Sequence, residues 1–144
     1  MDDKVFEIRI LKINVLSFSF IGKESLENPN IDENEINYKY KSNIGLKVNP
    51  NDEIIDIKIS LKVFLPKKKN EIINLEVLSS YHFKDLKSFI VEENEVELPE
   101  DLMKNLILTS LANTRGVLAV KVSESGFKNI ILPLIQMNEL KPKK

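Results

Sequence analysis

The feature that most constrains this chain is a clean two-residue alternation of apolar and polar side chains between Glu53 and Leu65. Such alternation is typical of a β-strand with one buried and one solvated face. Three further segments, 5–20, 35–48 and 72–83, are rich in β-branched and aromatic residues, and turn-forming Pro/Asn runs separate the last three strands. The sequence therefore predicts a four-stranded antiparallel sheet, arranged as a meander with one face in water.

The first segment, residues 5–20, has an irregular pattern. Its apolar residues form three groups that alternate between the two faces of a regular strand: Phe6, Ile8 and Ile10; Leu11, Ile13 and Val15; and Leu16, Phe18 and Phe20. A change of phase inside a strand is what a β-bulge produces, and a strand buried on both faces is the alternative. In either case we expect large apolar groups on both faces of this segment.

A helix is predicted after Pro99, because proline is tolerated at a helix start and the two acidic residues that follow complement the positive end of the helix dipole. Apolar residues from 102 to 114 recur at steps of three and four. Gly116 either ends this helix or lies inside it, in which case it continues to Val122. A short helical turn is predicted at Met137–Leu140. The expected fold is one α+β domain over residues 1–144: the sheet, then a long helix packed on it, then the short C-terminal helix.

Residue counts exclude several functions. The chain has no cysteine and one histidine, His82, which excludes disulfides, thiolate metal sites, cysteine nucleophiles and three-histidine metal centres. The 21 basic and 22 acidic residues argue against general nucleic-acid or membrane-surface binding. No segment approaches the roughly 18–20 apolar residues of a membrane span, and the N-terminus is unlike a secretory signal. We therefore expect a cytoplasmic protein that does not insert into membranes.

Catalytic motifs are missing as well. The four glycines form no nucleotide-binding or nucleophile-elbow pattern. His82 falls on the polar face of its strand, where a structural, solvated role is favoured. The acidic pairs Glu92/Glu93 and Glu100/Asp101 fall in a polar connection and at a helix start, which favours solvation and dipole pairing over acid–base chemistry. We expect no enzymatic activity, no cofactor and no metal.

The apolar surface is larger than one helix can cover. Both faces of the first strand and more than one face of the helix are apolar, and a helix buries only a narrow stripe. This surplus predicts oligomerisation, a hydrophobic groove, or both. The alternative is a compact monomer in which residues 130–140 fold back to complete the core.

The order of elements and two short motifs resemble the SecB export-chaperone family. The motifs are LTSLANTRG at residues 108–116 and IILPLIQMNEL at residues 130–140, and Glu76-Val77 on the last strand is also similar. The resemblance implies a homotetramer, a dimer of dimers with its helices between two sheets. It also implies ATP-independent binding of unfolded or precursor polypeptides in hydrophobic grooves.

The resemblance leaves the destination of the client open. SecB proteins that deliver to the SecA motor often end in a zinc-binding tail with cysteine and histidine, whereas this chain ends in Lys143-Lys144 with neither. Shorter SecB-like proteins also serve as chaperones of aggregation-prone antitoxins. Export with SecA as a partner, antitoxin chaperoning, and binding of one apolar ligand or one fixed protein partner are therefore all retained as alternatives.

Three sets of residues are predicted to carry these roles. The client-binding residues are apolar and come from the first strand and the C-terminal segment: Phe6, Phe18, Phe20, Leu134, Ile135, Met137 and Leu140. The residues expected at the oligomer interface are helix leucines: Leu106, Leu111 and Leu118. The residues of the SecB-like motifs with a structural role are Arg115, Gly116 and Pro133.

Overall fold

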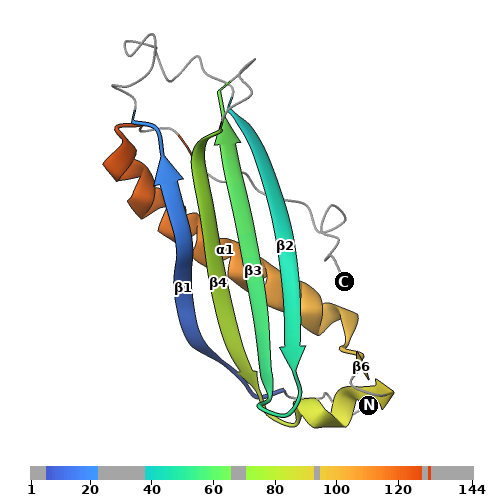
Figure 1. Cartoon of the computed structure of the whole chain (residues 1–144). Helices are drawn as coiled ribbons and strands as arrows, with labels where there is room; N and C mark the ends of the chain where they lie inside the picture. The colour runs from blue at the N-terminus through green and yellow to red at the C-terminus, as the bar shows by residue number, and fades with distance from the viewer. Residues whose placement is uncertain (1–5, 23–37, 66–70, 93–94, 128–129, 131–144) are drawn as a thin grey trace.

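Four long strands and one long helix dominate the part of the chain that the computed structural model describes, residues 6–22, 38–65, 71–92, 95–127 and 130 (Figure 1). The elements in chain order are β1 (Ile8–Phe20), β2 (Lys39–Asn49), β3 (Ile54–Phe64), β4 (Glu71–Phe83), the 3-10 helix η3 (Leu86–Phe89), β5 (Ile90–Glu92), β6 (Glu95–Val96) and α1 (Glu100–Ser125). The α+β class, the four-stranded antiparallel sheet and the long helix are confirmed. The short helix predicted at Met137–Leu140 lies outside the described residues.

The strand order is β1-β4-β3-β2, which corrects the predicted meander. Strands β2, β3 and β4 pair in succession, as their short connections dictate, but β1 pairs with β4. The connection from β1 to β2 is much longer than a hairpin turn, so nothing forces those two strands to be neighbours. As a result β1 and β2 both lie at sheet edges.

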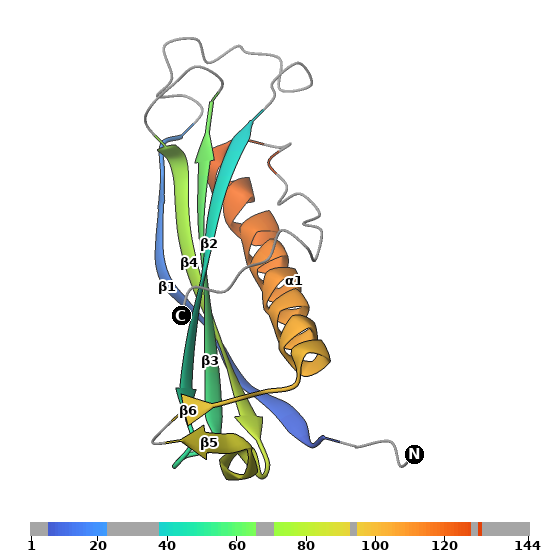
Figure 2. The same cartoon turned by 90° about the vertical axis from the view of Figure 1, so that its right-hand side faces the viewer.

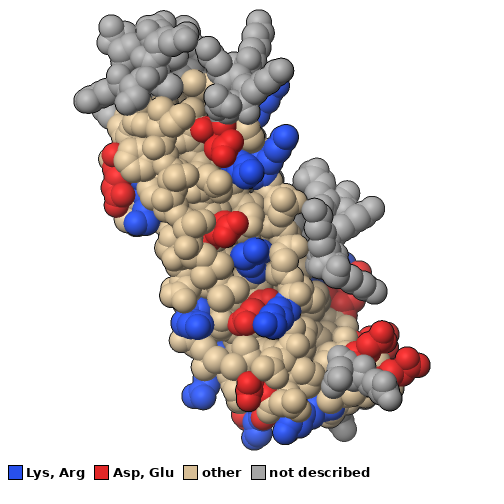
Figure 3. All heavy atoms as spheres, viewed as in Figure 1, with Lys and Arg blue, Asp and Glu red and all other residues tan. Residues whose placement is uncertain are grey.

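Alternate residues of β3 and β4 build the core on one face of the sheet. Directly opposed residues of antiparallel strands share a face, and the pairs Ile57–Ser79, Ile59–Val77 and Leu61–Leu75 are fully buried. Helix α1 lies against this face, which we call the helix face (Figure 2). On the opposite side, the open face, acidic and basic side chains are interspersed without a large patch of one sign (Figure 3).

Helix α1 runs without interruption from Glu100 to Ser125. It starts after Pro99 with two acidic residues in its first turn, as predicted, and passes straight through Gly116. It ends at Gly126, whose φ of 86° is a left-handed conformation that glycine adopts without strain. Phe127 and Ile130 follow and are buried, and the Phe127 ring meets Tyr38 edge-on at 6.2 Å. None of the helices in the described ranges is both long and apolar enough to cross a membrane.

Polar bonds fix α1 on the sheet. Tyr81 donates to Ser110 Oγ at 2.7 Å, and Ser110 in turn donates to the Leu106 carbonyl at 2.8 Å. One turn further on, Asn113 donates to Ser79 Oγ at 3.2 Å. The pKa of the Tyr81 phenol is raised above its ordinary value, because the effect of burial outweighs the opposite effect of the hydrogen bond with Ser110. Buried polar groups that find partners specify one arrangement, so these bonds set where along β4 the helix crosses.

Two β-bulges interrupt β1. Its pairing with β4 shifts between Ile10 and Lys12 and again between Val15 and Ser17, so Leu11 and Leu16 are the extra residues. The predicted phase changes are therefore bulges. The bulges bring one set of apolar side chains to the helix face, opposite core residues of β4: Ile8, Ile10, Ile13, Val15, Phe18 and Phe20. The two bulge residues, Leu11 and Leu16, are themselves exposed.

The packing of α1 predicts a clear contrast in stability. Leu118 has no exposed surface, so Leu118→Ala leaves a cavity and lowers the free energy of unfolding by about 2–5 kcal/mol. Val91 on β5 is 59% exposed, and Val91→Ala changes it by about 0.5 kcal/mol or less. Urea denaturation followed by circular dichroism measures both, and similar values for the two variants would contradict the packing described.

The bulges predict an unusual tolerance to deletion. Removing Leu16 leaves the pairs Val15–Val77 and Phe18–Leu75 in place and converts this part of β1 into a regular strand. Removing Asn14 instead moves Ile13 opposite Leu78, on the wrong face. We expect cooperative urea unfolding to survive the first deletion and to be lost in the second. Equal damage from both deletions would be inconsistent with a bulge at Leu16.

Candidate binding surface on the first strand

The largest run of exposed apolar side chains in the described residues follows β1. We call its helix-face members Ile10, Ile13, Val15, Phe18 and Phe20 the β1 strip. Ile10 is 49% exposed, Ile13 44%, Val15 42% and Phe20 41%. Side chains of this kind normally belong to a core, and their neighbours across the strand pair on β4 are fully buried. The strip therefore continues the core to the edge of the sheet and leaves it uncovered.

The position of α1 explains this exposure. The helix crosses the sheet diagonally (Figures 1 and 2), passing over Tyr81 and Ser79 and contacting β1 near its end. There the Lys121 ammonium lies 5.4 Å from the centre of the Phe18 ring. Ile10 and Ile13 pair with Tyr81 and Ser79, so they lie one strand beyond the helix crossing. One helix cannot cover β4 and the full length of its outer neighbour.

An aromatic pair closes the strip at the C-terminal end of β1. The rings of Phe18 and Phe20 are 5.4 Å apart and tilted by 32°. Phe18 is half-buried and packs on the core, while Phe20 is exposed. Both predicted client-binding residues therefore lie on one surface, with Phe20 the more accessible of the two.

Phe6 occupies a different environment from the strip. It is half-buried in a cluster with Phe83 and Phe89, with ring centres 5.7 Å and 6.0 Å away. These contacts fix the segment before β1 against η3 and the core. The structure thus gives Phe6 a packing role and does not bring it together with Phe18 and Phe20.

The helix leucines require a correction. Leu106, Leu111 and Leu118 were predicted at an oligomer interface, but each is at most 5% exposed and belongs to the core beneath α1. They have almost no surface left for a second subunit. The apolar residues that α1 leaves exposed are Leu108 at 41% and Val120 at 65%.

The remaining predicted residues divide into two groups. Arg115 is half-buried and Gly116 is exposed on α1, where an added Cβ would meet nothing within 4 Å. The C-terminal members lie outside the described residues: Pro133, Leu134, Ile135, Met137 and Leu140. Sequence reasoning missed Ile10, Ile13 and Val15 as surface residues. The available signal was the phase change itself, because bulges are most common on strands at the edge of a sheet, where apolar side chains have fewer neighbours to cover them.

Titratable side chains are spread out in the described ranges. No set of three or more His, Asp and Glu side chains there is close enough to hold a metal ion. His82 lies on the open face, opposite Arg9 of β1 and Ile54 of β3, as its strand position predicted. The chemistry available on the β1 strip is burial of apolar surface, worth about 25 cal/mol per Å².

Comparisons with known proteins bear on the fold. No protein-family model and no curated protein matches the sequence. Among solved structures, the chain is similar to a SecB-like chaperone of Mycobacterium tuberculosis, solved in complex with a ChAD peptide from the HigA1 antitoxin. The TM-score is 0.55 at 10% identity, covering 90% of this chain and 88% of that one. A protein of unknown function from Streptococcus agalactiae matches with a TM-score of 0.44 at 12% identity, covering 91% and 100%. The four-stranded antiparallel sheet with one long helix is thus the fold of a SecB-like chaperone.

Proposed function

We propose that the protein is an ATP-independent chaperone, a holdase that binds unfolded or precursor polypeptides on apolar surface and keeps them for export or a related handover. The observation that carries this proposal is the β1 strip. An unfolded chain exposes the apolar side chains that such a strip can bury, and binding of this kind needs no catalytic group. The SecB-like fold supports the same role.

The shape of the strip suits unrelated clients. Apolar contact is non-directional and makes few demands on the sequence of the bound chain. The strip also lies on an edge strand, where an extended segment can pair with the backbone between its apolar contacts. Extended, apolar and unfolded segments are therefore the clients that this surface fits best.

A homotetramer is the assembly that we propose for this chaperone. Leu108 and Val120 are large apolar side chains that α1 leaves exposed, and Gly116, which lies between them in the sequence, is exposed and adds no bulk; we call this exposed part of the helix its outer face. Small residues let two helices approach closely, so this face suits contact with the helix of a second copy. The β1 strip is then left for the client.

A second candidate function is chaperoning of an antitoxin. The similar chaperone of Mycobacterium tuberculosis was solved with a peptide from an antitoxin, which favours this client over a secretory precursor. The two functions use the same kind of surface and differ in the number of clients. Tight binding of one partner together with failure to bind unrelated unfolded proteins would select the antitoxin role.

The role of the strip is tested by the double variant Ile10→Ser/Ile13→Ser. Both side chains are half exposed, so their loss affects binding more than folding, whereas Phe18 is also part of the core packing. We expect affinity for reduced, carboxymethylated α-lactalbumin to fall about tenfold or more, measured by fluorescence anisotropy without nucleotide.

The matched control for this test is Ile90→Ser/Val91→Ser, which removes two exposed apolar side chains from β5. We expect it to bind the unfolded protein like the wild type. Light scattering on all three proteins separates loss of client binding from loss of assembly. Unchanged affinity in a folded Ile10/Ile13 variant would count against the strip as the client surface.

The assembly is tested on the outer face of α1. We expect light scattering to give roughly 66 kDa for the wild type, four chains of 16.6 kDa. Val120→Lys places a charge in the proposed interface and lowers the measured mass, whereas Asn14→Lys, on the open face, leaves it unchanged. A wild-type monomer, or a tetramer that persists in Val120→Lys, contradicts this arrangement.

A further inference from the structure

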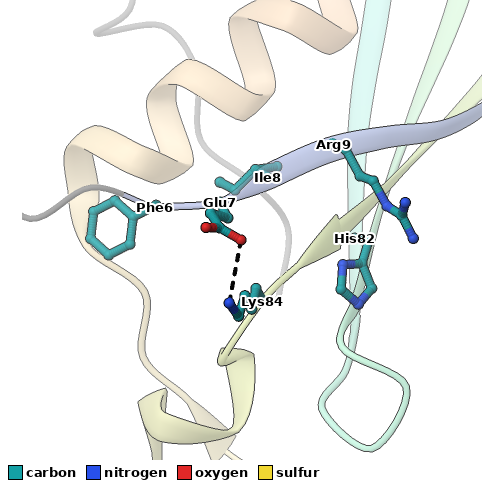
Figure 4. Close-up of a pocket in the computed structure, with 6 residues that line it drawn as sticks. All are labelled: Phe6, Glu7, Ile8, Arg9, His82 and Lys84. Atoms are coloured by element: carbon teal, nitrogen blue, oxygen red, sulfur yellow. Dashed lines mark ion pairs between the residues drawn. The ribbon is translucent and has the colours of Figure 1, made fainter.

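A pocket of mixed chemistry lies at the start of β1, next to Ile10, the first residue of the β1 strip. Its volume is about 430 Å³, and its walls are formed by six residues: Phe6, Glu7, Ile8, Arg9, His82 and Lys84 (Figure 4). Arg9 and His82 are direct partners in the β1–β4 pairing, so their side chains are neighbours on the open face. The pocket thus combines apolar groups with three nitrogen-bearing side chains.

Within the described ranges, the positive charge of Arg9 in this pocket has no counter-charge. Lys84 Nζ lies 3.5 Å from Glu7 Oε2, so these two residues form an ion pair. No acidic side chain among the described residues pairs with Arg9, which faces His82 instead. The one carboxylate that lines the pocket, Glu7, is engaged with Lys84. Arg9 therefore has unused donors beside the imidazole N–H of His82.

The choice of arginine at position 9 also favours binding of an oxyanion. Arg9 and Arg115 are the only arginines among the 21 Lys and Arg residues, so all the others are lysine. A guanidinium differs from an ammonium in presenting a planar fork of donors that matches a carboxylate in two parallel bonds. Placing one of two arginines opposite the only histidine creates an oxyanion-binding geometry that lysine does not provide.

We propose that this pocket binds the carboxylate of an acidic side chain in a client polypeptide, an inference that rests on the proposed holdase function. A single uncompensated charge suits a monoanion. The Glu7 carboxylate, which lines the pocket, disfavours a doubly charged phosphate. Phe6 and Ile8 also line the pocket, but they lie on the helix-face side of β1, so the carboxylate itself meets Arg9 and His82 on the open face.

The position of Arg9 on β1 connects the pocket to the strip. Side chains of a strand alternate between faces, so Arg9 points to the open face while Ile8 and Ile10 point to the helix face. A client segment that lies along this edge alternates in the same way. Its apolar side chains meet the strip, and the side chain between them meets Arg9. The preferred client therefore carries an acidic residue between two apolar ones.

The single histidine supplies a direct readout. Ring signals of His82 in an NMR spectrum need no assignment, because the chain contains no other histidine. The probes are sodium acetate, sodium phosphate and the capped tripeptides Val-Glu-Val and Val-Gln-Val, each titrated at fixed pH and ionic strength against sodium chloride. We expect saturable shifts with acetate and the glutamate peptide, and none with the glutamine peptide.

Three variants locate the binding group. Arg9→Gln weakens binding of the glutamate peptide about tenfold, as loss of a charge-assisted hydrogen-bond pair implies. Glu7→Gln strengthens it, because Lys84 is released from its ion pair. Lys62→Gln removes a charge from the open face opposite Asn74, at the other end of β4, and leaves the affinity unchanged.

These outcomes separate a failure of the carboxylate-binding proposal from a failure of the holdase proposal. A His82 response to phosphate alone, or no response beyond that to chloride, overturns the carboxylate assignment. If unfolded α-lactalbumin still binds in that case, the holdase function stands without the pocket. A response to the glutamate peptide in a protein that binds no unfolded client supports the pocket and overturns the holdase function.

Discussion

The mismatch in width between one helix and four strands is the constraint on which the rest of the structure depends. A helix with its side chains is roughly 10–12 Å across, whereas strands lie about 4.8 Å apart, so a single helix covers two or three of them. Helix α1 is fixed over β4 through Tyr81 and Ser79, which leaves both edges of the sheet short of cover. On the β2 side, Phe127 packs on Tyr38 and supplies part of what is missing. No described segment covers β1 in this way, and its apolar side chains remain at the surface.

Much of the fold follows from local sequence patterns. The alternation of Ile55, Ile57 and Ile59 indicated a half-buried strand, and these three residues are fully buried. The start of α1 after Pro99 followed from the proline and the acidic residues behind it. The two phase changes in β1 coincide with the two register shifts in its pairing with β4. Each of these signals acts within a few residues of the structure that it predicts, which is why it could be read from the chain.

What sequence reasoning missed depends on contacts between distant segments. Strand β1 pairs with β4, and the long connection after Phe20 permits this pairing. No local sequence pattern indicates which strand β1 will pair with. The same holds for Leu118: a helical apolar stripe shows that a residue is buried, but not whether its partner is the same chain or another copy. Arg9 and His82 are far apart in sequence and become neighbours only through the β1–β4 pairing. Binding surfaces built from such pairings appear only once the register is known.

The bulges at Leu11 and Leu16 have a consequence for a protein that presents an apolar edge strand. Fibril growth requires an unbroken ladder in which each added strand repeats the hydrogen bonds of the one before it. In β1 the 13-residue strand is divided into short regular stretches, so an incoming chain can pair with a few residues and then loses register. The edge strand can therefore pair with a short client segment without acting as a template for further strands. For the proposed holdase, the same surface is thereby prevented from seeding aggregation of a bound chain.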